Sequence, residues 1–166
     1  MNIDKLDVKT RKRLLWVLLI LNMAAIFALS SQPADVSTEK SDVLVALPKL
    51  LFELANPEMA GSEAVYLVIQ FIVRKTAHVL EFATLSALAA GLLLLYEKRS
   101  PYLMGALFSM LYAVTDEWHQ TFIPGREGKI SDWCFDSAGA VLGAVVLWAV
   151  LRHWYKKKAA RRSKSA

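Results

Sequence analysis

Apolar runs long enough to span a membrane recur along this chain, separated by short polar segments. Four windows of about 20 mostly apolar residues, the length a helix needs to cross a hydrocarbon core, lie at about 13–31, 76–96, 102–121 and 132–151. The third window is the least apolar, because Asp116 and Glu117 fall inside it. The pattern predicts an all-α polytopic membrane protein, built as a four-transmembrane-helix bundle.

The segment between the first two windows, residues 32–75, contains shorter apolar stretches at 43–55 and 64–73. In the first stretch, large apolar residues recur at helical spacing: Val43, Leu44, Leu47, Leu50, Leu51 and Leu54. We interpret both stretches as amphipathic helices at the membrane interface, with a re-entrant element as the alternative. Pro48 is expected to kink the first helix.

Composition agrees with a membrane protein of one domain, residues 1–166, since 55% of the residues are hydrophobic. The net charge of +5 does not indicate nucleic-acid binding, because the basic residues crowd into the tails 1–13 and 152–166 rather than into an aromatic-rich patch. Membrane lipid is the expected partner of these tails. The single cysteine, Cys134, cannot form a disulfide within the chain.

The distribution of lysine and arginine predicts the orientation, since these residues stay preferentially in the cytoplasm. With four spans, the side of the membrane that holds both termini carries 14 of the 20 lysines and arginines, and the opposite side carries 6. Both termini are therefore predicted to be cytoplasmic. The loops after the first and third windows are predicted to lie on the extracytoplasmic side.

Ionisable residues gather at that extracytoplasmic end of the windows. Arg74, Lys75, His78 and Glu81 open the second window, Asp116, Glu117, His119 and Gln120 close the third, and Asp132 and Asp136 open the fourth. Spacings of three or four residues place Arg74, His78 and Glu81 on one helix face. The same holds for Asp116 with Gln120 and for Asp132 with Asp136. Ionisable groups at membrane depth are costly, so they normally face the bundle interior or water and pair with one another.

These residues are the candidate site. His78, Glu81, Asp116 and Glu117 are candidates for acid–base chemistry, and Arg74, Lys75, His119, Gln120, Arg126, Asp132 and Asp136 are candidates for ligand binding. Arg126, in a Gly-containing loop, is suited to clamp a phosphate or carboxylate. Structural alternatives stay open: Glu81 paired with a neighbouring basic residue, and Asp132 capping its helix. Gly139 and Gly143 indicate close helix packing, either within the chain or in a homo-oligomer.

The sequence assigns no cofactor and no metal. Histidines and carboxylates of the candidate site are able to bind zinc or another divalent ion, but no compact ligand motif such as H-E-x-x-H occurs. The chain also lacks a G-x-S-x-G elbow, a P-loop and a dinucleotide fingerprint. The near balance of positive and negative groups suits a hydrogen-bonded salt-bridge network, and it suits a metal site less well.

Four segments together resemble the VanZ-like family, which is named for a protein that raises teicoplanin resistance. They are residues 27–33 (FALSSQP), 74–82 (RKTAHVLEF), 112–120 (YAVTDEWHQ) and 124–139 (PGREGKISDWCFDSAG). Phe82 stands where the family often has tyrosine, so a role for that hydroxyl is not expected here. Trp118 occupies a position that is usually aliphatic.

The resemblance implies a multi-pass protein of the bacterial plasma membrane, linked to glycopeptide susceptibility, without implying a reaction. Teicoplanin carries a lipid tail and acts on lipid-linked wall precursors at the outer membrane surface, where the candidate site is predicted to lie. The first hypothesis is a site that binds or modifies a lipid-linked cell-wall precursor or a lipoglycopeptide. The second is an accessory protein whose polar cluster locks the helices together, and the third is a small transporter.

Overall fold

The computed structural model describes residues 7–164, with the side chains at 35, 36, 38–41, 163 and 164 left out. Lys5 of the predicted N-terminal tail lies outside the described residues. The described part is all helical: α1 (Val8–Ser30), α2 (Ala34–Ala55), the short 3-10 helix η2 (Pro57–Met59), α3 (Glu63–Leu95), α4 (Pro101–Gln120) and α5 (Ile130–Lys164). This confirms the all-α prediction.

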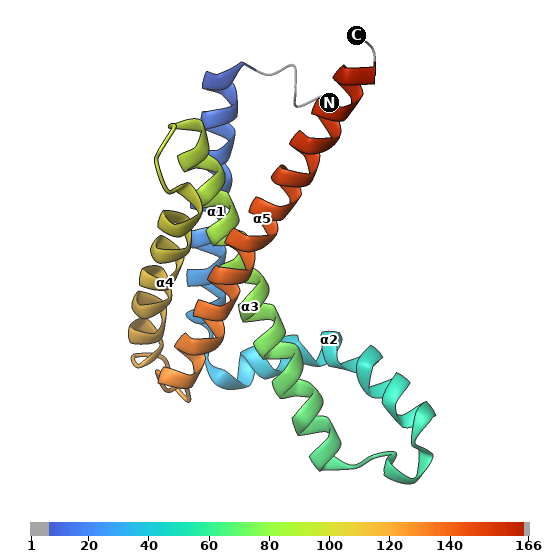
Figure 1. Ribbon diagram of the computed structural model, residues 1–166. Helices are drawn as coiled ribbons and strands as arrows, with labels where there is room; N and C mark the ends of the chain where they lie inside the picture. The colour runs from blue at the N-terminus through green and yellow to red at the C-terminus, as the bar shows by residue number, and fades with distance from the viewer. Residues whose placement is uncertain (1–6, 165–166) are drawn as a thin grey trace.

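Helices α1, α3, α4 and α5 pack into a bundle, while α2 leaves it sideways and returns through η2 to the start of α3 (Figure 1). The chain runs along the bundle four times, so α1 begins and α5 ends at the same end of it (Figure 1). Contacts hold that shared end together: the ammonium of Lys12 lies over the ring of Tyr96, and the Trp16 indole donates to the Tyr96 hydroxyl.

Three of the described helices are long and apolar enough to cross a membrane by length and composition: Val8–Ser30, Glu63–Leu95 and Ile130–Arg162. The prediction of four such spans is therefore corrected to three. Helix α4 covers the expected third window, but its last turns contain Asp116, Glu117 and Gln120, which lower its mean hydropathy. All three of those side chains are buried against the other helices.

The stretch 64–73 is helical as predicted, but it is not a separate helix, because it forms the first third of α3. No helix-breaking residue separates it from the predicted span 76–96. Arg74 and Lys75 marked a boundary in the sequence pattern, yet they lie in the middle of a continuous helix. The stretch 43–55 is helical as predicted, within a longer α2 that contains Pro48 in its interior.

Glycines set how closely the helices cross. At Gly139 and Gly143 of α5, an added Cβ would overlap the backbone of Val79 and Ala83 in α3. Gly105 of α4 similarly lies against α3, where an added Cβ would be 2.7 Å from the backbone nitrogen of Ala90. The predicted glycine stripe therefore serves packing within the chain. Around these crossings, α1, α3 and α4 share an apolar core of Leu19, Ile26, Phe82, Leu85, Ala89, Leu92 and Ala113.

Candidate functional site

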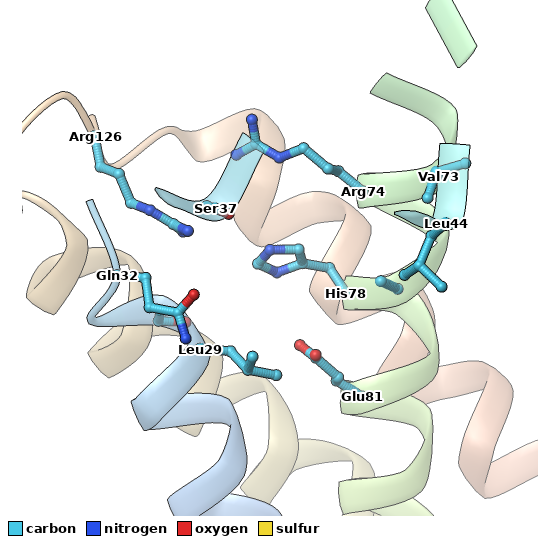
Figure 2. Close-up of a pocket in the computed structure, with 11 residues that line it drawn as sticks. Leu29, Gln32, Ser37, Leu44, Val73, Arg74, His78, Glu81 and Arg126 are labelled. Carbon is cyan, nitrogen blue, oxygen red and sulfur yellow. The ribbon is translucent and has the colours of Figure 1, made fainter. Parts of the chain in front are cut away.

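A cavity of about 170 Å³ opens at the end of the bundle where α1 ends and α5 begins. Its polar lining includes Arg74, His78 and Glu81 of α3 and Arg126 of the loop between α4 and α5. Figure 2 shows Arg74 and Arg126 approaching the space above His78 from opposite sides, with Glu81 about one turn below. The remaining lining comes from Leu29, Ser30, Gln32, Ser37, Leu44, Val73 and Ala77.

The two arginines of the cavity have few partners among the side chains that the structure describes. Arg74 makes no ion pair or side-chain hydrogen bond with any of them, and the buried Nε of Arg126 has no acceptor there. Arg126 donates one long hydrogen bond of 3.4 Å to Gln120. Burial, and next the charge of Arg74, lower the pKa of Arg126. An arginine stays protonated at neutral pH, so this pair favours a bound anion.

Asp116 is held by two neighbours at the inner side of the site. The hydroxyl of Ser30, the last residue of α1, donates to Asp116 Oδ2 over 2.9 Å, and Gln120 Nε2 donates to the same oxygen over 2.8 Å. Both contacts are buried. Ser30 was not among the site residues predicted from the sequence, although a serine at the polar end of an apolar helix was the available signal.

Asp136 lies next to His78, with its Oδ1 3.5 Å from His78 Nδ1. The Asp136 side chain is 1% exposed, and neither of its oxygens accepts a hydrogen bond from the described residues. One ligand atom each of His78, Asp116 and Asp136 lies within 4.8 Å of the other two. The packing of the bundle therefore brings together residues from three different helices.

Lys75 and Asp132 form a separate ion pair of 2.7 Å between α3 and α5. Asp132 also lies in the first turn of α5, as predicted, where a carboxylate stabilises the helix dipole. Neither residue lines the cavity. Their contacts agree with a structural function.

Glu117 and His119 do not line the cavity. Glu117 Oε2 accepts from the backbone N–H of Lys129 over 2.9 Å and so fastens the loop to α4. His119 stacks on Phe27 with ring centroids 4.5 Å apart, and its Nε2 lies 3.1 Å from the Ser31 hydroxyl. The structure thus brings together Arg74, His78, Glu81, Asp116, Gln120, Arg126 and Asp136, and separates Lys75, Glu117, His119 and Asp132 from them.

Comparison with known proteins gives one match. The family model described as VanZ/LLP1 matches residues 15–152. No curated protein and no solved structure shows a significant match. The matched range contains the cavity and the buried carboxylates beside it.

Proposed function

Because this chain belongs to the VanZ/LLP1 family, as the sequence motifs predicted, we propose that it binds an anionic amphiphile of the cell envelope in the cavity between Arg74 and Arg126. The single observation that carries the proposal is this pair of guanidinium groups. They converge on the cavity (Figure 2), and neither forms an ion pair with a side chain that the structure describes.

The apolar walls of the cavity support an amphiphile rather than a free ion. Leu29, Leu44, Val73 and Ala77 line it beside the arginines. A headgroup phosphate or carboxylate would accept bidentate hydrogen bonds from a guanidinium group, while a lipid tail would follow the apolar side. Lipid-linked wall precursors and lipoglycopeptides both combine such a tail with a polar head.

The site also has groups for modifying what it binds. His78 and Glu81 lie on one face of α3 below the arginines (Figure 2). An imidazole and a carboxylate beside a bound headgroup are suited to move a proton during the conversion of that headgroup. We therefore propose His78, Glu81 and Asp116 as the acid–base candidates, and leave out Glu117 because it holds the loop.

We propose that the cavity faces away from the cytoplasm of a bacterial plasma membrane. The end at which α1 begins and α5 ends carries most of the basic residues, including the helical tail from Arg152 onward. Basic segments remain in the cytoplasm and associate with anionic lipid. The cavity at the opposite end would then meet envelope molecules at the outer leaflet, and so affect susceptibility to teicoplanin.

Ligand binding by the full chain in detergent tests the proposal. The probe is farnesyl diphosphate, compared with farnesol, which lacks the anion, and with pyrophosphate, which lacks the tail. Arg74→Gln and Arg126→Gln are each expected to weaken farnesyl diphosphate binding about 10- to 100-fold, because a hydrogen bond to a charged group contributes about 1.5–3 kcal/mol.

The matched control is Arg99→Gln, which removes an exposed arginine at the other end of the bundle. It should bind like the wild type. If farnesyl diphosphate binds no better than farnesol, or if Arg99→Gln weakens binding as much as Arg126→Gln, the proposal is wrong. Teicoplanin susceptibility of cells expressing each variant at equal membrane level then tests the link to the phenotype.

The helix-locking alternative has its own support in the contacts at this end. Lys75 with Asp132 ties α3 to α5, and Ser30 with Asp116 ties α1 to α4. In this alternative the protein has no ligand and acts as an accessory membrane protein. It predicts that Arg74→Gln and Arg126→Gln lower thermal stability in proportion to any loss of phenotype.

A further inference from the structure

His78, Asp116 and Asp136 form a compact cluster that anion binding by the arginines does not use. Each residue comes from a different helix, α3, α4 and α5. One potential ligand atom of each lies within 4.8 Å of the others. Asp116 and Asp136 are 4% and 1% exposed, so packing fixes both carboxylates in place.

Asp136 is the residue that points to a bound cation. Both of its carboxylate oxygens are buried, and no described residue donates a hydrogen bond to either of them. His78 Nδ1 is buried without a hydrogen-bond partner as well. A buried carboxylate is stable only when a positive group compensates its charge, because the cost of its desolvation is several kcal/mol.

The distance between His78 and Asp136 fits a shared metal ion better than a direct hydrogen bond. His78 Nδ1 and Asp136 Oδ1 are 3.5 Å apart, whereas N–H···O hydrogen bonds span about 2.7–3.2 Å. Two ligands that each bind a tetrahedral zinc ion at about 2.0–2.2 Å lie about 3.3–3.6 Å from one another. The observed separation falls in this range.

Two hydrogen bonds orient the Asp116 carboxylate, as is common for carboxylates that bind metal ions. Ser30 and Gln120 both donate to its Oδ2, at 2.9 and 2.8 Å. Such hydrogen bonds from an outer shell fix the direction of a ligating carboxylate. Oδ1 accepts no hydrogen bond from the described residues, so it is available to the cluster.

We propose that His78, Asp116 and Asp136 bind one divalent transition-metal ion at the floor of the cavity. Two carboxylates neutralise the charge of such an ion, and an imidazole ligand favours zinc or a similar ion over magnesium or calcium. Three protein ligands leave a coordination position for water or for a bound headgroup. The proposal does not depend on anion binding, since it uses neither arginine. With His78 and Asp116 as metal ligands, Glu81 is the remaining acid–base candidate of the cavity.

Metal binding by the full chain, purified in detergent and freed of metal with a chelator, tests this proposal. Zinc is the probe, its stoichiometry measured by elemental analysis and its affinity by competition with a chelating dye. We expect about one zinc ion per chain. Asp136→Asn and His78→Gln should each weaken zinc binding more than about 100-fold, since outer-shell partners alone contribute about 10- to 100-fold.

The chain offers matched controls. His119→Gln and Asp132→Asn remove an imidazole and a carboxylate at the same end of the bundle but outside the cluster, and both should bind zinc like the wild type. Arg126→Gln should also keep zinc while losing farnesyl diphosphate, which separates this proposal from the proposed function. Absence of zinc from the wild type, or equal losses in ligand and control variants, would overturn it.

Thermal unfolding distinguishes a metal ligand from a structural residue. Without zinc, Asp136→Asn should unfold at the wild-type temperature or above it, because the substitution removes a buried carboxylate that accepts no hydrogen bond from the described residues. Zinc should raise the Tm of the wild type and of His119→Gln, and leave that of Asp136→Asn unchanged. If Asp136→Asn instead lowers the Tm of the zinc-free protein, Asp136 is a structural partner of His78 and the proposal fails.

Discussion

Ser30, the last residue of α1, donates a hydrogen bond of 2.9 Å to Asp116 near the end of α4, and both side chains are buried. The two residues are 86 positions apart in the chain. This contact joins the first helix to the polar site, although α1 contributes no ionisable residue to it. The Ser30 hydroxyl therefore orients one of the buried carboxylates together with the amide of Gln120.

Replacing Ser30 by alanine is expected to destabilise the protein by about 1–3 kcal/mol, because it removes one of the two donors to a buried carboxylate. Thermal unfolding in detergent measures the effect. Thr115→Ala is the matched control, since this exposed hydroxyl donates only to the carbonyl of Tyr112 within its own helix. A smaller loss in Ser30→Ala than in Thr115→Ala contradicts the prediction.

The crossing of α3 and α5 gives a second prediction. Gly143→Ala places a methyl group against the backbone of Ala83, which has no side-chain freedom to move aside. Overpacking of this kind costs about 1–3 kcal/mol, so the Tm in detergent should fall.

Gly91→Ala is the control for that substitution. The nearest atom to a Cβ at Gly91 is Leu15 Cδ1, at 3.8 Å, which is an ordinary contact. Alanine in a helix interior is more favourable than glycine by about 0.5–1 kcal/mol, so Gly91→Ala should keep or raise the Tm. Equal behaviour of the two variants would show that α3 and α5 do not cross at Gly143.

A third prediction concerns the ion pair between Lys75 and Asp132, which we interpret as a structural contact between α3 and α5. The two side chains are only 17% and 24% exposed and lie 2.7 Å apart. Lys75→Gln and Asp132→Asn should each reduce stability, while the double variant should lose less than the sum of the two losses.

The expected coupling is about 1–3 kcal/mol, as for a hydrogen bond between charged groups. A double-mutant cycle on thermal stability measures it, with the exposed pair of Glu127 and Lys129 as the comparison. Exposed pairs contribute about 0–1 kcal/mol. Additive losses at Lys75 and Asp132 would mean that the pair does not hold α3 to α5.

The sequence correctly predicted which residues of α5 share one face of the helix. The spacing of three or four residues between Asp132, Asp136, Gly139 and Gly143 correctly placed carboxylates and glycines on the side of α5 that meets α3. The sequence also indicated that these positions lie at one end of the bundle, because ionisable groups at membrane depth are costly and normally pair with one another.

The features that the sequence did not predict depend on contacts between helices. Arg74 and Lys75 suggested a helix boundary, because charged residues normally mark the end of an apolar span. In the structure α3 continues through them, since Lys75 finds Asp132 and Arg74 reaches the cavity. Likewise, Glu117 and Asp116 are adjacent in sequence and equally acidic, yet only Asp116 joins the cluster, because neighbouring residues of a helix face different directions.

The orientation of the molecule gives the last prediction. A cysteine introduced at Glu127, an exposed position in the loop beside Arg126, should react with a membrane-impermeant maleimide in intact cells. The background is Cys134→Ser, because Cys134 is itself exposed. A cysteine at Lys98, at the opposite end of the bundle, is the matched position and should react only after the membrane is opened. The reverse pattern would place the cavity on the cytoplasmic side, and the proposed encounter with envelope molecules at the outer leaflet would then be wrong.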